Sequence, residues 1–374
     1  MSSTQMLTTD ALALKVWAKT DWVNMGQRKA FGHLFERGAV YYAKDFEGLN
    51  KRGDQITYDY AGKLTGFPVG EGGTLDGNEE ALNLGSFTMA INVTRIGVLS
   101  PNDDTIEQQR TLVSFPETTR KLIPSRHDEL LDASVFNQLA GFNPTSYTQN
   151  GTTWSGAAKL FVQGHNTPVA PSSDRIIRAG AVATDQALGS GNKFTLDLID
   201  AALEKNNLSD QPMEMFDDMT YDLFVSPEQF VDLKQDTSGA ITWFNIQLAQ
   251  LEGGKNSKVE DQMYKGMPCL GKYANVNIYE APRVAFGQNS STSAVITTVR
   301  RAVMVGKNAL TYASPFGHPT KGKNPPLKYF SQLKDYEYYK GIEGRMIYGL
   351  KKTTATNSQD IGVMVISTYA AAHS

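Results

Sequence analysis

Residues 266–273 come nearest, in this chain, to a site for nucleotide chemistry. They read Gly-Met-Pro-Cys-Leu-Gly-Lys-Tyr, close to the phosphate-binding loop in which glycines, a lysine and a hydroxyl residue hold phosphate and magnesium. Tyr273 stands where that loop has serine or threonine, and Pro268 removes a backbone N–H donor. Strand-forming Val276 and Ile278 follow, instead of a helix whose N-terminus could receive the phosphate. These departures indicate a chance match.

The other residues that could do chemistry are scattered along the chain. Residues 70–73, Gly-Glu-Gly-Gly, lack the strand-to-helix setting of a dinucleotide fingerprint and are more typical of a hairpin tip. No two histidines have metal-ligand spacing, and no Gly-x-Ser-x-Gly elbow is present. The histidines are His33, His127, His165, His318 and His373.

Acidic pairs and the lone cysteine have ordinary structural explanations. Residues 79–80 and 217–218 fit no EF-hand pattern and are typical of solvated carboxylates. Cys269 is typical of a small buried apolar side chain and excludes an intrachain disulfide. We therefore predict that the chain is not an enzyme and has no catalytic residue, no metal and no cofactor.

Composition and charge describe a globular chain without a nucleic-acid surface. Its 374 residues, 40% hydrophobic and 20% charged, suffice for two or three domains with a substantial core. The net charge of −3 gives no clustered positive footprint. We expect the doublets 300–301 and 351–352, Arg-Arg and Lys-Lys, to be ordinary strand-end charges. Tight DNA binding is therefore not expected.

No segment predicts secretion or membrane insertion. The first residues lack a basic region followed by an apolar run, and no stretch reaches the length of apolar residues that crosses a bilayer. We expect the chain to be made in the cytoplasm and to have no membrane partner.

A long glycine-rich β-hairpin is predicted for residues 54–99. Ile56, Tyr58 and Tyr60 alternate with polar residues, and Phe87 and Met89 do the same on the return. Many glycines and few large apolar residues lie between the two strands. Such a hairpin is marginal by itself, so it is either a flexible surface loop or an arm that lies on a neighbouring subunit.

A long helical region follows in residues 103–141. Asp103 and Asp104 can cap its first turn, while Pro116 and Pro124 are expected to break or kink it. Gly141 supplies the stop. Its buried stripe is formed by Leu131, Val135 and Leu139.

From residue 192 onward the pattern is that of an inserted α/β unit. Thr195 is a plausible cap for a helix, and residues 221–225 predict a strand that enters the capping box Ser-Pro-Glu-Gln at 226–229. Helices near 229–234 and 243–251 and strands near 274–279 and 294–299 complete the unit. The chain then returns to its first body.

The last forty residues predict a two-stranded unit that closes the core. Residues 344–351 alternate at period two, with Met346, Tyr348 and Leu350 on one face. Residues 361–367 are apolar on both faces, as in a strand covered on both sides. The unit carries no catalytic equipment.

This order of elements resembles the major capsid (head) protein family of tailed bacteriophages, with the Hong Kong-97-type fold, and is most similar to the head proteins of large podoviruses and related phages. The resemblance is carried by residues 223–229 (Leu-Phe-Val-Ser-Pro-Glu-Gln), by 300–310 (Arg-Arg-Ala-Val-Met-Val-Gly-Lys-Asn-Ala-Leu), by 341–352 and by the closing strand 361–370. It covers nearly the whole chain.

The resemblance implies an α+β fold with five parts. These are an N-terminal arm with first helices (1–50), an extended β-hairpin loop (51–100), a peripheral domain with the spine helix (101–191), an axial domain (192–320) and a return to the peripheral domain (321–374). The extended loop would contact the adjacent subunit. The expected contact residues are Lys63, Phe67, Glu71, Leu75, Glu79 and Leu82.

The implied function is a structural one. The chain would assemble as hexamers and pentamers into an icosahedral head that encloses double-stranded DNA, and its location would be the capsid shell of the virion. The main partner of each subunit would be other copies of the same chain. Portal, scaffold and decoration proteins are further possible partners, and packaged DNA would be contacted weakly and without sequence specificity. Nothing aligns Lys63 with an asparagine on a neighbour, so we predict no covalent crosslinking. The alternatives are an encapsulin-like bacterial compartment and, remotely, a nucleotide-binding enzyme.

Overall fold

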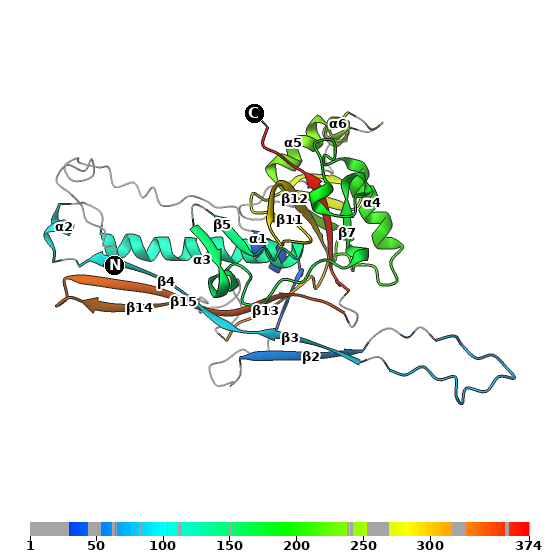
Figure 1. Ribbon diagram of the computed structural model, residues 1–374, viewed down its shortest axis with the longest axis horizontal. Coiled ribbons are helices and arrows are strands. Elements are labelled where there is room, and N and C mark those ends of the chain that lie inside the picture. The colour runs from blue at the N-terminus through cyan, green and yellow to red at the C-terminus, as the bar shows by residue number, and fades with distance from the viewer. Residues whose placement is uncertain are drawn as a thin grey trace.

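A long helix and two β-sheets make the frame of this α+β chain (Figure 1). The computed structural model describes residues 30–43, 54–61, 64, 66–82, 84–102, 104–110, 114–149, 152–237, 239, 242–252, 269–315, 327–355 and 359–373. The helices are α1 (Ala30–Glu36), α2 (Ile106–Gln109), α3 (Phe115–Ala140), α4 (Leu196–Asn207), α5 (Pro227–Gln235) and α6 (Trp243–Glu252), with short 3-10 helices η2 (Gly156–Phe161), η3 (Ser173–Arg175), η4 (Ala179–Ala181) and η5 (Asp185–Ala187). The strands are β1 (Val40–Tyr42), β2 (Gln55–Ala61), β3 (Leu84–Ala90), β4 (Asn92–Pro101), β5 (Ser146–Gln149), β6 (Thr152–Ser155), β7 (Ile176–Arg178), β8 (Tyr221–Val225), β9 (Cys269–Tyr273), β10 (Val276–Glu280), β11 (Phe286–Gln288), β12 (Val295–Val305), β13 (Leu310–Ala313), β14 (Leu327–Lys334), β15 (Tyr339–Lys352) and β16 (Val363–Tyr369).

Strand β15 organises the first sheet. Within the described residues this sheet has five strands in the order β1-β13-β15-β14, and β4 also pairs with β15. β15 is 14 residues long, so its first part holds β14 and β4 on its two edges and its last part holds β13. Its even-numbered residues from Ile342 to Leu350 are buried, whereas Gly341, Glu343 and Arg345 are only half-buried. The predicted alternation of this strand is confirmed.

Helix α3 lies along the buried face of β15 (Figure 1). It runs through Pro124 as one helix of 26 residues, so the predicted break there does not occur. Pro124 has no N–H for the backbone carbonyl of Arg120, and the hydroxyl of Tyr329 on β14 donates to that oxygen instead, at 3.2 Å. Pro116 lies in the first turn, where proline is tolerated.

The two ends of the helical region are set by local chemistry. The cap of α2 is Thr105, whose Oγ1 accepts a hydrogen bond from the Gln108 N–H, and not Asp104 as predicted; Asp103 lies outside the described residues. Gly141 ends α3 in the left-handed conformation at φ 61°, as predicted. A Cβ there would lie 2.3 Å from the carbonyl oxygen of Val169, so glycine is required for two reasons.

The helix and the strand approach each other closely at Gly344. A Cβ at this position would lie 2.3 Å from Cγ2 of Ile123 on α3. His127 on the same helix contacts the Gly344 carbonyl oxygen through Nε2 at 3.2 Å. Glycine at this position therefore lets β15 and α3 pack against each other without a gap.

The second sheet is covered on both faces. It has seven strands within the described residues, in the order β7-β16-β12-β8-β10-β9, with β11 also on β12. Successive residues of β16 alternate between two cores: Val363 and Val365 pack with α3, whereas Met364 and Ile366 pack with the core that contains α4, α5 and α6. The prediction of a strand covered on both sides is confirmed for residues 363–367, whereas Ile361 and Gly362 precede the strand and Ile361 is exposed.

The prediction of a terminal two-stranded unit is wrong. β15 and β16 do not pair with each other; β15 lies in the five-stranded sheet, and β16 lies between β7 and β12 in the seven-stranded one. The physical reason lies in the different hydrophobic patterns of the two strands. A strand that is apolar on both faces needs cover on both sides, whereas the alternating β15 needs only one covered face.

The strand-to-helix turn after β8 is as predicted. The Ser226 hydroxyl oxygen accepts from the Gln229 N–H, and the Gln229 side chain accepts from the Ser226 N–H, which completes a capping box. Gln229 also donates to Thr368 Oγ1 at 2.8 Å, which ties α5 to β16. Thr195 precedes α4 as predicted but makes no side-chain capping bond.

The hairpin predicted for residues 54–99 is confirmed for β2 and β3, but residues 92–99 of its predicted return strand belong to β4 and pair with β15 instead. They pair antiparallel from Gln55 opposite Ala90 to Ala61 opposite Leu84. In Figure 1 the loop beyond them projects away from the body of the molecule. Of the predicted arm 1–50, the structure describes α1, β1 and the residues around them; the helices predicted before residue 30 lie outside the described residues. The five domain boundaries stay predictions.

Candidate assembly surfaces

The loop between β2 and β3 exposes apolar side chains that have no core of their own. Phe67 is 93% exposed, Leu75 61% and Leu82 60%, and Glu71 and Glu79 are exposed beside them. These five were predicted contact residues, and the structure brings all of them onto one projecting loop. The sixth, Lys63, lies outside the described residues. Exposed apolar side chains grouped on one element are typical of an interaction surface.

The loop holds its shape through short local bonds. The Gly73 N–H donates to the Gly70 carbonyl at 3.0 Å, and the Gly77 N–H donates to Oε2 of Glu79 at 2.8 Å. A further turn is closed by the Asn78 N–H on the Leu75 carbonyl. Residues 70–73 thus form a turn on the hairpin loop, as expected. No strand or helix forms between β2 and β3 in the described residues.

The loop is acidic throughout. Residues 64–94 contain no lysine or arginine. They contain four acidic residues, Glu71, Asp76, Glu79 and Glu80. A partner of this loop therefore needs apolar surface together with positive charge.

The base of the hairpin is anchored firmly. Phe87 and Met89 are buried in a small core. The Asn166 side chain exchanges hydrogen bonds with the backbone of Ala90, at 2.9 and 3.1 Å, and Lys351 Nζ donates to the Thr88 carbonyl at 2.6 Å. An arm with a fixed base and exposed apolar side chains toward its tip can position that tip for a partner.

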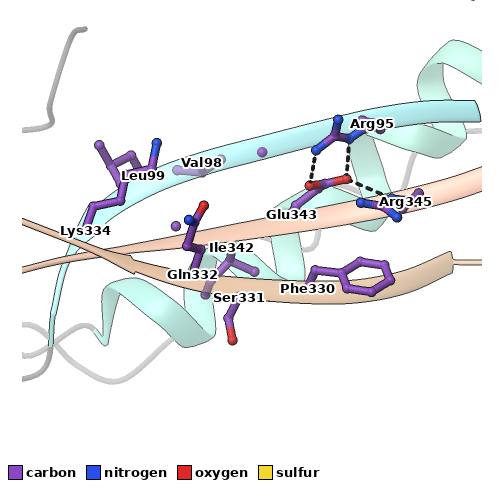
Figure 2. Close-up of a pocket in the computed structure, with 12 residues that line it drawn as sticks. Arg95, Val98, Leu99, Phe330, Ser331, Gln332, Lys334, Ile342, Glu343 and Arg345 are labelled. Carbon is purple, nitrogen blue, oxygen red and sulfur yellow. Dashed lines mark hydrogen bonds and ion pairs between the residues drawn. The ribbon is translucent and has the colours of Figure 1, made fainter. Parts of the chain in front are cut away.

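A second surface is the face of β4, β15 and β14 that points away from α3 (Figure 2). Here Arg95 binds Glu343 through two hydrogen bonds of 2.6 and 2.7 Å, and Arg345 reaches the same carboxylate at 3.1 Å. The Arg345 guanidinium lies 4.2 Å from the ring centre of Phe330. These side chains border a shallow groove of about 510 Å³.

Electrostatics keep the groove positive at neutral pH. Hydrogen bonds from Arg95 are the main reason that the pKa of Glu343 falls to about 2; slight burial opposes the shift and Arg345 adds to it. Glu343 is therefore ionised, but one carboxylate cannot neutralise two guanidiniums. Lys334 adds a third cation to the lining.

The turn between β14 and β15 is a third exposed feature. Asp335, Tyr336 and Glu337 all have positive φ, at 52°, 49° and 71°, which non-glycine residues seldom adopt. Asn102 holds this turn through its side chain on the Glu337 carbonyl and its N–H on the Tyr338 carbonyl, both at 3.0 Å. The turn presents Tyr336 fully to solvent.

Buried ion pairs hold the frame together and correct one expectation. Arg301 is 6% exposed and donates to Oδ2 of Asp185 at 2.8 Å and to the Ala140 carbonyl at 3.1 Å. Lys352 is 1% exposed and lies 2.8 Å from Oδ1 of Asp360. The prediction of ordinary strand-end charges is therefore wrong for these two residues, because each neutralises a buried carboxylate.

The surroundings of Asp185 illustrate how such a pair works. Burial alone would raise its pKa, but the guanidiniums of Arg301 and Arg178 outweigh burial and hold the pKa below its ordinary value. The carboxylate therefore stays charged inside the protein and joins β12, η5 and the end of α3.

Cys269 and Tyr273, which lie in the segment that resembles a phosphate-binding loop, are part of a β-strand in the structure. Cys269 is buried at the start of β9, where burial raises its pKa. β9 turns directly into β10, so no helix follows Tyr273; the first part of the loop-like segment lies outside the described residues. Among the residues that the structure describes, no group of three or more His, Cys, Asp or Glu side chains is placed to hold a metal ion. No described helix is long and apolar enough to span a membrane.

Sequence reasoning missed the basic groove. Arg95 falls in the predicted return strand of the hairpin, Arg345 falls in the predicted strand 344–351, and Glu343 directly precedes that strand. The groove forms because β4 and β15 pair over ten residues, from Pro101 opposite Tyr339 to Asn92 opposite Tyr348. The available signal was the charged alternation at 343 and 345, but a pairing partner cannot be read from one strand alone.

Comparisons with known proteins point to one family. A family model described as phage capsid protein matches residues 5–372. Similar folds occur in the capsid of Ralstonia phage GP4 (21% identity, TM-score 0.72) and the capsid asymmetric unit of cyanophage Pam1 (18%, 0.67), each covering 100% of both chains. The acid-stable capsid of Helicobacter pylori bacteriophage KHP30 is also similar (11%, TM-score 0.60, covering 98% of this chain and 99% of that one). No curated protein sequence matches the chain.

Proposed function

The chain belongs to the phage capsid protein family, and from this premise we propose that residues 64–84 lie on an adjacent subunit and join the capsid shell. The protein is a structural major capsid protein of the phage head, has the Hong Kong-97-type fold and resides in the capsid shell of the virion; it is not an enzyme. This membership sets aside the encapsulin-like and nucleotide-enzyme alternatives.

In this proposal the shell is built from hexamers and pentamers around double-stranded DNA. The net charge of −3 suits a wall that contacts packaged DNA weakly and without sequence specificity. Portal, scaffold and decoration proteins are the further partners. Noncovalent contacts hold the subunits together, each of the size of a stable interface, roughly 1,200–2,000 Å².

One observation carries the role of the loop. Its apolar side chains, Phe67 above all, are exposed on an arm whose base packs into a small core of the described residues. Large apolar side chains on a projecting loop gain stability only when another molecule covers them. Phe67, Glu71, Leu75, Glu79 and Leu82, together with Lys63, are the proposed contact residues.

A loop deletion tests the proposal. Residues 62–83 are replaced by Asn-Gly, which suits a two-residue turn between the paired ends Ala61 and Leu84. We expect a folded chain with unchanged circular dichroism and melting temperature that forms no shells in electron micrographs. Normal particles from this variant would show that the loop is not needed for assembly and would contradict the proposal.

Substitutions give the matched control. Replacing Phe67, Leu75 and Leu82 together by serine removes the apolar contacts and is expected to prevent assembly. Phe67→Leu, Leu75→Met and Leu82→Met keep the loop apolar and are expected to assemble. Equal assembly of the serine and the conservative variants would also contradict the proposal.

A further inference from the structure

The loop between β2 and β3 contains the single Asp-Gly pair of the sequence, Asp76-Gly77, and both residues are exposed. In such a pair the backbone nitrogen of the glycine can attack the side-chain carboxyl carbon of the aspartate and close a five-membered ring. Glycine allows this attack best, because it has no Cβ to hinder the approach and rotates most freely about its backbone. The pair is therefore a position at which the chain can modify itself.

The structure places this pair at the centre of a turn. The Asn78 N–H donates to the Leu75 carbonyl at 2.9 Å and closes the turn, and the Asn78 side chain donates to the Thr74 carbonyl at 2.9 Å. Gly77 has a φ of 84°, which suits glycine at the third position of a turn. Among the described residues no hydrogen bond holds the Asp76 carboxylate. Its carboxyl group can therefore rotate toward the Gly77 nitrogen.

A proton acceptor lies beside the attacking nitrogen. The Gly77 N–H donates to Oε2 of Glu79 at 2.8 Å, and this is the N–H that must lose its proton when the ring closes. A carboxylate at hydrogen-bond distance can take that proton as a general base. The next residue, Glu80, accepts from the Gly66 N–H at 2.5 Å and ties this side of the loop to the opposite side. The nitrogen and its proton acceptor are therefore held together.

We propose that Asp76 converts spontaneously to isoaspartate in the unassembled chain, with Glu79 as the proton acceptor. The Gly77 nitrogen forms a bond to Cγ of the protonated Asp76 carboxyl, its proton passes to Glu79, and the carboxyl hydroxyl leaves as water, which gives a succinimide. Water then adds to the main-chain carbonyl carbon of Asp76 and breaks the bond from that carbon to the Gly77 nitrogen. The main chain now runs through Cβ and Cγ of residue 76. One water leaves and one returns, so no other reactant is needed.

The conversion changes the shape of the loop. It adds a methylene group to the main chain inside the turn that Asn78 and Leu75 close, so this hydrogen bond cannot keep its geometry. Leu75 and Glu79, two of the proposed contact residues, are displaced relative to each other. This consequence, unlike the conversion itself, rests on the proposed function of the loop. A subunit that stays unassembled would lose its ability to assemble, whereas a neighbour that covers the loop would restrict the rotation of Asp76 and slow the reaction.

Peptide mapping of the unassembled full-length chain tests the conversion. Trypsin releases residues 64–95 as one peptide, because no lysine or arginine lies between Lys63 and Arg95. The Asn-Gly pair at 150–151 closes the same kind of ring with loss of ammonia and serves as an internal clock on another peptide. The chain is kept at neutral pH and physiological temperature until the clock peptide has reacted. We expect isoaspartate at residue 76, identified by retention time and fragment ions. Unmodified Asp76 at that point would overturn the proposal.

Variants of the unassembled chain test the chemistry. Asp76→Glu keeps the charge but would need a six-membered ring, so no product is expected at this position. Glu79→Gln cannot take the proton and should slow the conversion several-fold, less than the roughly 10²–10⁴-fold of a preorganised base because Glu79 is exposed. Glu71→Gln removes a carboxylate of the same loop that has no described bond to Gly77 and should leave the rate of conversion unchanged. Equal rates for Glu79→Gln and Glu71→Gln would refute Glu79 as the proton acceptor.

Assembly assays separate this inference from the proposed function. We expect isoaspartate to form several-fold more slowly in assembled shells, and aged unassembled chain to form fewer shells than fresh chain, whereas aged Asp76→Glu should form as many as its fresh sample. If isoaspartate forms equally fast in shells and aged chain assembles normally, the proposed function of the loop fails while the conversion stands. If Asp76 stays unmodified in the unassembled chain, the inference fails, and the loop deletion alone decides the proposed function.

Discussion

Removing the charge of Lys352 should destabilise the chain strongly, although the sequence presents it as one of two adjacent strand-end lysines. Its ammonium lies 2.8 Å from Oδ1 of Asp360, and the two side chains are 1% and 0% exposed. Burial lowers the pKa of Lys352 and raises that of Asp360, and their mutual attraction opposes both shifts. Lys352→Met keeps the side-chain length and leaves a buried carboxylate without its counter-charge.

The magnitude follows from the burial of both partners. Breaking a buried pair by removing one ion costs about 3–5 kcal/mol, a large part of the roughly 5–15 kcal/mol that separates a folded domain from its unfolded state. Replacing an exposed lysine changes stability far less. The free energy of unfolding of Lys334→Met, on the exposed strand β14, should stay within about 0.5 kcal/mol of that of the unchanged chain. The assay is urea unfolding of the unassembled full-length chain at pH 8, followed by circular dichroism.

The dependence on pH separates the charge from the packing. Without Lys352 the pKa of Asp360 rises further above its unfolded value of about 3.8, so the deficit is full above the folded pKa and shrinks as pH falls. Lys352→Met combined with Asp360→Asn should recover most of the loss at pH 8. A deficit below about 1 kcal/mol, or one that does not change between pH 8 and pH 5, would refute the reasoning.

Three further outcomes are expected. Burial lowers the pKa of His165 to about 4. The contribution of neutral His165 to stability is therefore complete above the unfolded pKa of about 6.5 and is lost as pH falls toward 4. Between pH 7 and pH 4 the stability of His165→Asn should fall by up to about 3 kcal/mol less than that of the unchanged chain, as measured by melting temperatures. Tyr329→Phe should cost about 1 kcal/mol but clearly less in a Pro124→Ala background, where the helix regains an N–H for the freed carbonyl; equal costs in a double-mutant cycle would contradict this. Gly141→Ala should destabilise by about 2 kcal/mol or more, because alanine is strained at positive φ and its Cβ meets a backbone oxygen; an unchanged urea midpoint would show that the loop yields freely.

Features that depend on a few neighbouring residues could be predicted from the sequence. The capping box at Ser226 and Gln229, the stop at Gly141 and the strands of the hairpin follow from hydrogen bonds and side-chain periods within a single element. The exposed loop residues were also predictable, because an apolar residue such as Phe67 among glycines has no local partner to bury it.

Pairing between distant elements could not be predicted in the same way. The pattern of β16 showed that both of its faces are covered, but it did not name β12 and β7 as its neighbours. Arg301 and Lys352 look like surface cations until Asp185 and Asp360 are brought beside them from 116 residues and 8 residues away along the chain. The basic groove likewise exists only once Arg95 meets Glu343 across 248 residues.

The direct passage of β3 into β4 also has a mechanical meaning. Only Ile91 separates the two strands, so a pull on the loop by a neighbour is transmitted along nearly straight backbone into β4. β4 pairs with β15 over ten residue pairs. The hydrogen bonds of this pairing run perpendicular to the direction of the pull, so they are loaded together in shear and do not open one after another. If the loop lies on a neighbouring subunit as proposed, internal pressure on the head would load the pairing of β4 with β15 in each subunit.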